Sequence, residues 1–332
     1  MNKLTISVLT ILSLLSCAPK KSNSYDNKTG YSGNISISGA FALYPIVVLW
    51  SEDFKKIHPN VRFNISAGGA GKGITDVLTD MMDIGLVSRD LHQQELTNGA
   101  LPIFVAKDAV LGTYNAKHPN ANLIKERGLT QKELEGIFVT QRYKNWSDID
   151  AKFVNLPIRT YVRSDAAGAA ETWAKFFGQN QEDLKGVGIF GDPGLAQAIK
   201  DEPTSIGFNN INYVYDLSSK RTAENIAVIP LDQNANGKID KEESFYGTID
   251  ELTGAVAAGQ YPSPPSRPLA FVVKKGNINP LMQEFIRFVL DKQQQEHLLA
   301  NGYVPMTAAQ RTTELEKIKA DTVNSNNKIT NR

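Results

Sequence analysis

Cysteine is nearly absent from this sequence of 332 residues. The one cysteine, Cys17, stands near the start, so the remainder of the chain can form no internal disulfide and offers no pair of thiols to a metal ion. Histidine is also rare, with four residues scattered over polar stretches, and neither a His-x-x-x-His spacing nor a Gly-x-Ser-x-Gly elbow occurs. These absences argue against metal-dependent hydrolysis and nucleophilic catalysis, and we predict that the chain is not an enzyme.

Net charge is close to zero, because 36 basic side chains stand against 35 acidic ones. The composition therefore gives no support for binding to nucleic acid. The apolar run from Leu4 to Leu15 follows Lys3, is too short to span a bilayer and is typical of a signal-peptide core. It ends in the sequence Leu14-Leu15-Ser16-Cys17, which resembles a lipoprotein processing site.

We therefore predict a lipoprotein signal peptide over residues 1–17, with Cys17 lipidated and the protein tied to a membrane through that lipid. The alternative is a plain cleaved signal peptide with an incidental cysteine. Residues 18–32 are rich in Pro, Lys, Ser, Asn and Gly, which predicts a flexible tether. The expected location is the cell envelope, on a periplasmic or other extracytoplasmic face.

From Gly33 onward, short strand-like runs alternate with helical patterns, which indicates an α/β fold. Three strand-to-helix junctions are turns of small residues: GAFALYP at 39–45, GGAGKG at 68–73 and RSDAAGAAE at 163–171. A helix N-terminus presents free backbone N–H groups and the positive end of its dipole, so each junction is a potential anion site. Three such turns predict one oxyanion held between them.

Arg163, in the third turn, is the side chain best suited to hold such an anion. Its guanidinium presents a rigid fork of donors and stays charged at any working pH. Asp165 would either orient Arg163 or accept a proton from a ligand oxygen, and the spacing favours the orienting role. The alternative is that Arg163 and Asp165 form an ion pair on the protein surface, which would contribute little to stability.

The turns and four other segments resemble the substrate-binding proteins of phosphate ABC transporters. These segments are DIGLVSR at 83–89, LEGIF at 134–138, WSDI at 146–149 and NGYVP at 301–305. The similarity runs from about Ile35 to about Met306 and implies the type II periplasmic-binding-protein fold. That fold is an α/β architecture of two lobes, with two crossing segments and a ligand cleft between the lobes.

The resemblance implies crossings near Thr113 and Arg267, with lobe 1 formed by 33–113 plus 267–332 and lobe 2 by 114–266. It implies an extracytoplasmic solute-binding lipoprotein that captures an inorganic oxyanion, with phosphate favoured, for the permease of an ABC importer. The implied ligand-binding residues lie in the three turns and after the strand-like run at 84–87. They are Ala42, Leu43, Ala70, Gly71, Ser88, Arg89, Arg163, Asp165, Ala167, Gly168 and Ala169.

Several hydroxyl residues of this family are replaced by alanine. The third loop usually reads Arg-x-Asp-x-Ser-Gly-Thr, and here Ala167 and Ala169 stand at the Ser and Thr positions. Ala70 stands at the usual Ser of the second turn, and Ala40 and Ala42 stand where hydroxyl residues are common in the first. Each lost donor removes a hydrogen bond to a charged ligand, worth about 1.5–3 kcal/mol. The alternative function is therefore a non-transport envelope protein or sensor that binds another or a larger anion.

A separate motif, DQNANGKIDKEE at 232–243, fits the twelve-residue calcium loop of EF-hands. Side-chain oxygens stand at positions 1, 3, 5, 9 and 12, a backbone carbonyl at position 7 and a glycine at the turn. The predicted ligands are Asp232, Asn234, Asn236, Lys238, Asp240 and Glu243. We predict a structural Ca²⁺ of modest affinity, because two of the ligands are uncharged. The alternative is a hydrophilic loop that binds no metal.

Overall fold

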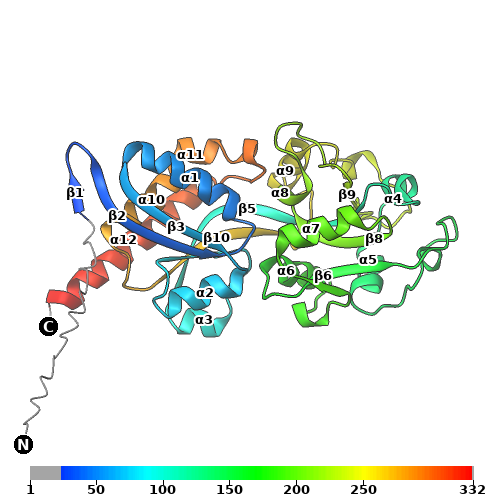
Figure 1. The fold of residues 1–332 in the computed structure, drawn as a ribbon, viewed down its shortest axis with the longest axis horizontal. Helices are drawn as coiled ribbons and strands as arrows, with labels where there is room; N and C mark the ends of the chain where they lie inside the picture. The colour runs from blue at the N-terminus through cyan, green and yellow to red at the C-terminus, as the bar shows by residue number, and fades with distance from the viewer. Residues whose placement is uncertain (1–23, 331–332) are drawn as a thin grey trace, which may run out of the picture.

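The computed structural model describes residues 24–330 and shows two lobes side by side along the long axis (Figure 1). The strands are β1 (Ser24–Asp26), β2 (Gly30–Gly39), β3 (Asn60–Ala67), β4 (Ile84–Val87), β5 (Ala100–Asn115), β6 (Arg159–Arg163), β7 (Val187–Ile189), β8 (Ser205–Asn210), β9 (Ile226–Val228) and β10 (Ser266–Lys274).

The helices of lobe 1 are α1 (Tyr44–Ile57), α2 (Ala70–Leu78), α3 (Gln93–Thr97), α10 (Pro280–Val289), α11 (Lys292–Glu296) and α12 (Ala308–Thr330). Those of lobe 2 are α4 (Ala121–Arg127), α5 (Gln131–Phe138), α6 (Gly168–Phe176), α7 (Gly191–Asp201), α8 (Ile211–Val214) and α9 (Ile249–Ala257). Short 3-10 turns lie at η1 (Trp146–Asp148), η2 (Gln181–Asp183), η3 (Lys241–Glu243) and η4 (Leu299–Asn301).

A continuous sheet links the two lobes, in the order β1-β2-β4-β10-β5-β8-β6-β7, with β3 paired to β2 and β9 to β5. β2 is parallel to β3 and β4, whereas β10 is antiparallel to both β4 and β5. The long strand β5 first pairs with β10 and then, from Val110 onward, with β8. The lobes are therefore joined by two neighbouring strands that are hydrogen-bonded to each other.

Each lobe has its own apolar core. Trp50, Phe54 and Phe271 are buried in lobe 1, and Trp146 and Trp173 are buried in lobe 2. Along β5 the change from one core to the other falls between residues 106 and 109. The crossings expected from the sequence, at residues 113 and 267, lie on β5 and β10.

The three expected strand-turn-helix junctions join β2 to α1, β3 to α2 and β6 to α6. α1 has a proline in its first turn, where the missing N–H costs no intrahelical bond. α2 begins at Ala70, directly after Gly69, whose φ of 86° suits a residue without a Cβ. The turn predicted at 68–73 therefore overlaps the first helical turn of α2.

The N-terminal boundary is a correction to the sequence prediction. Ser24–Asp26 pairs with Gly30–Ser32 in an antiparallel hairpin, so residues 24–32 are not an unstructured tether. The predicted signal peptide and lipidation site at Cys17 lie outside the described residues. In the part of the chain that the structure describes, no helix combines the length and apolarity needed to cross a membrane.

Candidate functional site

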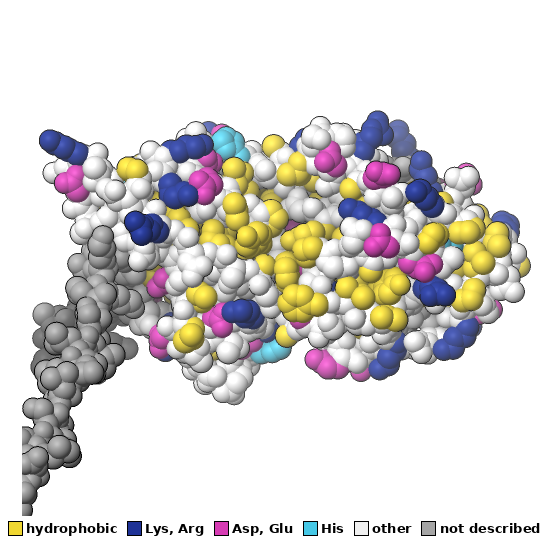
Figure 2. Space-filling model, in the orientation of Figure 1, with side chains coloured by type: hydrophobic (Ala, Val, Ile, Leu, Met, Phe, Trp, Pro, Cys, Tyr) yellow, Lys and Arg dark blue, Asp and Glu magenta, His cyan; other side chains and the backbone are white. Residues whose placement is uncertain are grey.

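The three turns meet at the junction of the lobes. The amides of Gly68 and Gly69 donate to the carbonyl of Gly39 at 2.9 and 3.2 Å, which joins the second turn to the first. The amide of Gly71 donates across the lobes to the carbonyl of Ala166 in the third turn, at 3.3 Å. Figure 2 shows apolar side chains gathered on the face where the two lobes adjoin.

Arg163 lies at this junction with only 1% of its side chain exposed. Its Nε donates to Asp165 Oδ1 at 2.8 Å and its Nη2 to Asp165 Oδ2 at 2.5 Å, while Nη1 donates to Asp192 Oδ2. The ring of Phe41 from lobe 1 covers the guanidinium, with its centroid 5.4 Å from Cζ. Burial opposes the charge of Arg163, but the carboxylates of Asp192 and Asp165 outweigh it and raise the pKa of the guanidinium.

The ion pair between Arg163 and Asp165 is thus buried, and Asp165 holds the guanidinium side-on as the spacing suggested. Three of the five guanidinium N–H groups are engaged by carboxylates, which leaves two for a ligand. Such charge-assisted pairs fix the direction in which the remaining donors point. The arrangement can hold an oxyanion, at a place where two carboxylates already compensate the arginine.

Asp192, at the start of α7, belongs to this candidate site and was not predicted from the sequence. It is 2% exposed, and its Oδ1 accepts a hydrogen bond from Asn210 Nδ2 at 2.8 Å. Burial raises the pKa of Asp192 above its usual range, against the opposing effect of Arg163 and Arg267. A sequence signal was present, because Gly191 makes a fourth strand-glycine-helix junction, after β7. In the structure its φ is 73°, and an added Cβ would lie 3.0 Å from the Phe41 ring.

The polar contacts continue from Asp192 to the crossing strands. Arg267 on β10 donates a hydrogen bond from Nη2 to the Oδ1 of Asn210. It also donates to the carboxylate of Asp108 on β5, from Nε at 2.8 Å and from Nη2 at 3.1 Å. Arg267 also reaches Thr172 of α6 through Nη1 at 3.3 Å. A buried row of side chains therefore connects Arg163 to both strands that join the lobes.

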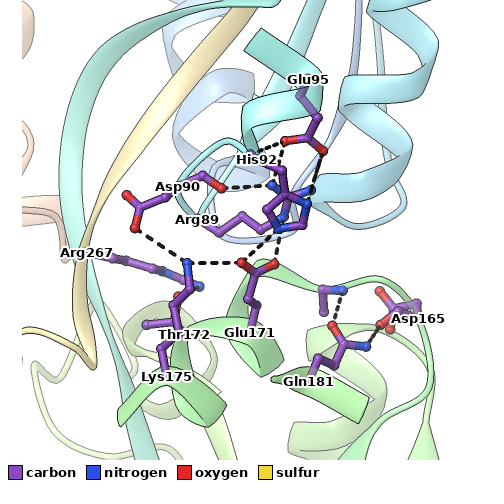
Figure 3. A network of polar contacts seen from close by, with 11 residues as sticks. Arg89, Asp90, His92, Glu95, Asp165, Glu171, Thr172, Lys175, Gln181 and Arg267 are labelled. Atoms are coloured by element: carbon purple, nitrogen blue, oxygen red, sulfur yellow. Dashed lines mark hydrogen bonds and ion pairs between the residues drawn. The ribbon is translucent and has the colours of Figure 1, made fainter. Parts of the chain in front are cut away.

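Ser88 and Arg89, after β4, meet α6 from the other side. A Cβ on Gly168 would lie 2.3 Å from Ser88 Oγ, so α6 can approach this closely only because position 168 is a glycine. Arg89 bonds Glu95 with both terminal nitrogens, at 2.9 and 2.7 Å, and its Nε lies 3.0 Å from Glu171 of α6 (Figure 3). Arg89 therefore lies in an ion network between the lobes, and a ligand would have to displace carboxylates to reach it.

The same network includes exposed groups. His92 Nε2 lies 3.2 Å from Glu171 Oε1, and Lys175 Nζ lies 3.1 Å from Glu171 and 3.5 Å from Asp90 (Figure 3). Arg89 and Glu171 are 8% and 14% exposed, whereas His92 and Lys175 are 57% and 41% exposed. The contacts of Arg89 with Glu171 and Glu95 are therefore the part of the network that is shielded from solvent.

The other predicted ligand residues supply buried backbone. Ala42, Leu43, Ala70, Ala167 and Ala169 are at most 2% exposed and pack into the two cores. The amide of Leu43 donates to the Ala40 carbonyl at 3.2 Å, and the amide of Ala167 donates to Gln181 Oε1 at 3.0 Å. With the bond from Gly71, the amides of three of the predicted ligand-binding residues bond within the protein in this conformation.

The predicted calcium loop is closed by hydrogen bonds among its own residues. Asp232 is 2% exposed and accepts the amides of Asn236 and Gly237, at 3.1 and 2.9 Å. Glu243 is 5% exposed and accepts the amide of Gln233 at 2.8 Å. The side-chain amide of Asn236 donates to Asp240 Oδ2 at 2.7 Å.

This loop carries the oxygen donors that Ca²⁺ prefers, but they are held by N–H groups of the loop itself. Within residues 24–330, no group of three or more His, Cys, Asp or Glu side chains is arranged to hold a metal ion. To coordinate calcium, Asp240 has to exchange the amide donors of Asn234 and Asn236 for the ion.

A family model described as a PBP superfamily domain matches residues 26–293. The chain belongs to the PBP superfamily. Among curated relatives, the phosphate-binding protein PstS of Bacillus subtilis is 27% identical over 293 residues, which cover 87% of this chain and 86% of that protein. The phosphate-binding protein PstS of Pseudomonas aeruginosa is 23% identical over 320 residues and covers 86% of both chains.

Solved structures share the same architecture. A substrate-binding protein from Clostridium perfringens with bound phosphate matches with a TM-score of 0.68 at 21% identity, over 83% of this chain and all of that one. An ABC-type phosphate transport receptor from Vibrio cholerae matches with a TM-score of 0.59 at 18% identity, over 82% and 100%. The predicted fold, two α/β lobes of a PBP-superfamily protein, is confirmed by the family match and by these structures.

Proposed function

We propose that this protein captures an inorganic oxyanion, phosphate, between its lobes and delivers it to the permease of an ABC importer. The observation that carries the proposal is Arg163, buried where the three turns meet, with two N–H donors left beside carboxylates that fix its orientation. The names of the relatives support phosphate as the ligand. Their description as binding proteins agrees with a chain that acts without catalysis.

Isothermal titration of the purified protein with phosphate, sulfate, molybdate and phosphonates tests this proposal. Phosphate should bind the wild type, and Arg163→Lys should weaken binding at least tenfold because a lysine cannot keep the side-on pair and the two remaining donors together. Arg159→Lys is the matched control: Arg159 lies on the same strand but its side chain is 63% exposed. Equal affinities for the wild type and Arg163→Lys would refute this placement of the site.

The alternative function, an envelope protein or sensor without a transporter, is favoured by the alanines at the turns. Ala167 and Ala169 supply no hydroxyl, and the amides of Gly71 and Ala167 bond within the protein. A protein that binds a phosphonate or another larger anion, and inorganic phosphate not at all, would support this alternative.

For the location we propose the cell envelope, with the chain anchored through a lipid on Cys17. The support is the apolar run followed by Ser16-Cys17 and the kinship with binding proteins of importers. Incorporation of labelled fatty acid into the wild type and its loss in Cys17→Ser tests the anchor. Labelling that persists in the variant would refute it.

We also propose that the loop 232–243 binds a structural Ca²⁺. The support is the complete spacing of oxygen donors, together with two carboxylates, Asp232 and Glu243, that are nearly fully buried at the two ends of the loop. Bound calcium would attract carboxylates at both ends of the loop and so hold the segment after β9 close to the segment before α9. Its role would be stability rather than chemistry.

A further inference from the structure

The row of side chains behind Arg163 holds more negative than positive groups. It contains two arginines, Arg163 and Arg267, and three aspartates, Asp108, Asp165 and Asp192. All five side chains are at most 8% exposed. With every group ionised, this buried row carries one excess negative charge.

An oxyanion bound to Arg163 adds further negative charge to the same enclosed place. Buried charge without compensation is strongly unfavourable, and titratable groups in this position change their protonation state. The anion also competes with the carboxylates for Arg163. A proton on one of the three aspartates would neutralise one unit of this excess negative charge.

Asp192 has the weakest compensation of the three. Asp165 is held by Arg163 through two nitrogens and also accepts the amide of Gly191 at 3.1 Å. Asp108 is held by two nitrogens of Arg267. Asp192 has a single bond from Arg163 and one from the uncharged amide of Asn210.

The charged and titratable groups around Asp192 come from several elements. Arg163 and Asp165 approach from β6 and the turn after it, Arg267 from β10, and Tyr213 from α8. The two arginines lower the pKa of Asp192, but burial outweighs them and raises it. When an anion also binds Arg163, the attraction between Arg163 and Asp192 that lowers the pKa of Asp192 becomes weaker. The carboxyl of Asp192 should therefore bind a proton more readily in the complex.

We infer that Asp192 takes up one proton from solvent when an oxyanion binds beside Arg163. The proton adds to a carboxylate oxygen, Asp192 becomes a neutral carboxyl, and the charge of Arg163 is then compensated by Asp165 and the ligand. Binding is thereby linked to pH, and affinity rises as the pH falls. This inference rests on the proposed function, because it requires the oxyanion site at Arg163.

The test compares the pH dependence of phosphate affinity in the wild type and Asp192→Asn, measured by titration calorimetry. If Asp192 takes up one proton on binding, each unit of increasing pH raises the wild-type Kd by a factor about tenfold larger than the factor by which it raises the Kd of the variant. The ionisation of phosphate itself affects both proteins equally and cancels in the comparison. Asp201→Asn, a change of an exposed carboxylate at the end of the same helix, should keep the wild-type slope.

A second measurement needs no variant. Phosphate should produce a protonated-carboxyl band in the infrared difference spectrum of the wild type, and titrations in two buffers of different protonation enthalpy, well below the second ionisation of phosphate, should show proton uptake. Phosphate binding with neither signal, or with equal slopes in the wild type and Asp192→Asn, would overturn the inference alone. A wild type that binds no oxyanion would overturn it together with the proposed function.

Discussion

The salt bridge between Arg89 and Glu171 connects the two lobes, and its removal should shift the protein toward an open form. Arg89 follows β4 of lobe 1 and Glu171 lies on α6 of lobe 2, with Nε and Oε2 3.0 Å apart. Glu171→Gln keeps the size of the side chain but removes its charge. Arg89 keeps Glu95 as a partner, so the variant leaves no buried arginine without compensation.

The size of the effect follows from burial. The contacts of Glu171 with His92 and Lys175 involve exposed partners and contribute little. The contact with Arg89 is shielded, and a hydrogen bond to a charged group is worth about 1.5–3 kcal/mol net. Because glutamine can still accept from Arg89, we expect a loss of about 1–2 kcal/mol, which changes the ratio of closed to open protein by roughly 5- to 30-fold.

Energy transfer between dyes on the two lobes measures this ratio. Exposed positions Asn98, after α3, and Gln197, on α7, are suitable for single introduced cysteines. Without ligand, Glu171→Gln should show a larger low-transfer population than the wild type, and it should release phosphate faster. Glu52→Gln is the matched control, since the pair of Glu52 and Lys55 lies on the surface of α1 within one lobe. Identical transfer distributions in the wild type and Glu171→Gln would show that this pair does not hold the lobes together.

Three further outcomes can be checked separately. Calcium at 100 times its Kd should raise the stability of the wild type by about 2.7 kcal/mol, seen as a higher melting temperature than with a chelator, and Glu243→Gln should melt at one temperature in both conditions. Gly168→Ala should weaken phosphate binding because its Cβ would collide with Ser88, whereas Gly254→Ala, where the added Cβ meets no atom within 4 Å, should bind like the wild type; equal loss in both would refute the steric argument. Burial lowers the pKa of His118 to about 4, so the neutral ring contributes stability above pH 6.5 that is lost as the pH falls toward 4, up to about 3 kcal/mol. Urea unfolding at pH 7 and pH 5 should show a smaller drop for His118→Gln, and an equal drop would contradict this.

The sequence predicted the arrangement of elements well because the junctions are local. A short alternating run, small residues and a periodic apolar segment are enough to place β2, β3 and β6 ahead of α1, α2 and α6. Local signals also mark helix ends: Thr130 and Glu133 form a capping box at α5, and Gly302 adopts the left-handed conformation after η4. The hairpin of β1 and β2 was missed because polar residues around a turn look the same in a tether and in an edge strand.

The site was harder to predict, since it depends on partners distant in the chain. Arg163 and Asp165 are neighbours in sequence, and their pairing could be expected. Asp192 lies 29 positions from Arg163, and only the packing of α7 beside β6 brings the two together. Arg89 was assigned to a ligand because a sequence cannot show that a carboxylate from another lobe, Glu171, lies beside it.

The pairing of β5 with β10 determines how the lobes can move. Ala109 on β5 lies opposite Ser266 on β10 where the cores change, and the two connections pair through a ladder of hydrogen bonds with one register shift, between Leu269 and Ala270. Such a ribbon can twist or flex perpendicular to its own plane, but in-plane bending or sliding of one strand along the other would break the ladder. We therefore expect the lobes to open mainly by a twist or an out-of-plane bend of these two strands, a motion that would bring the turns at Gly39, Gly69 and Arg163 back into the same alignment on closing.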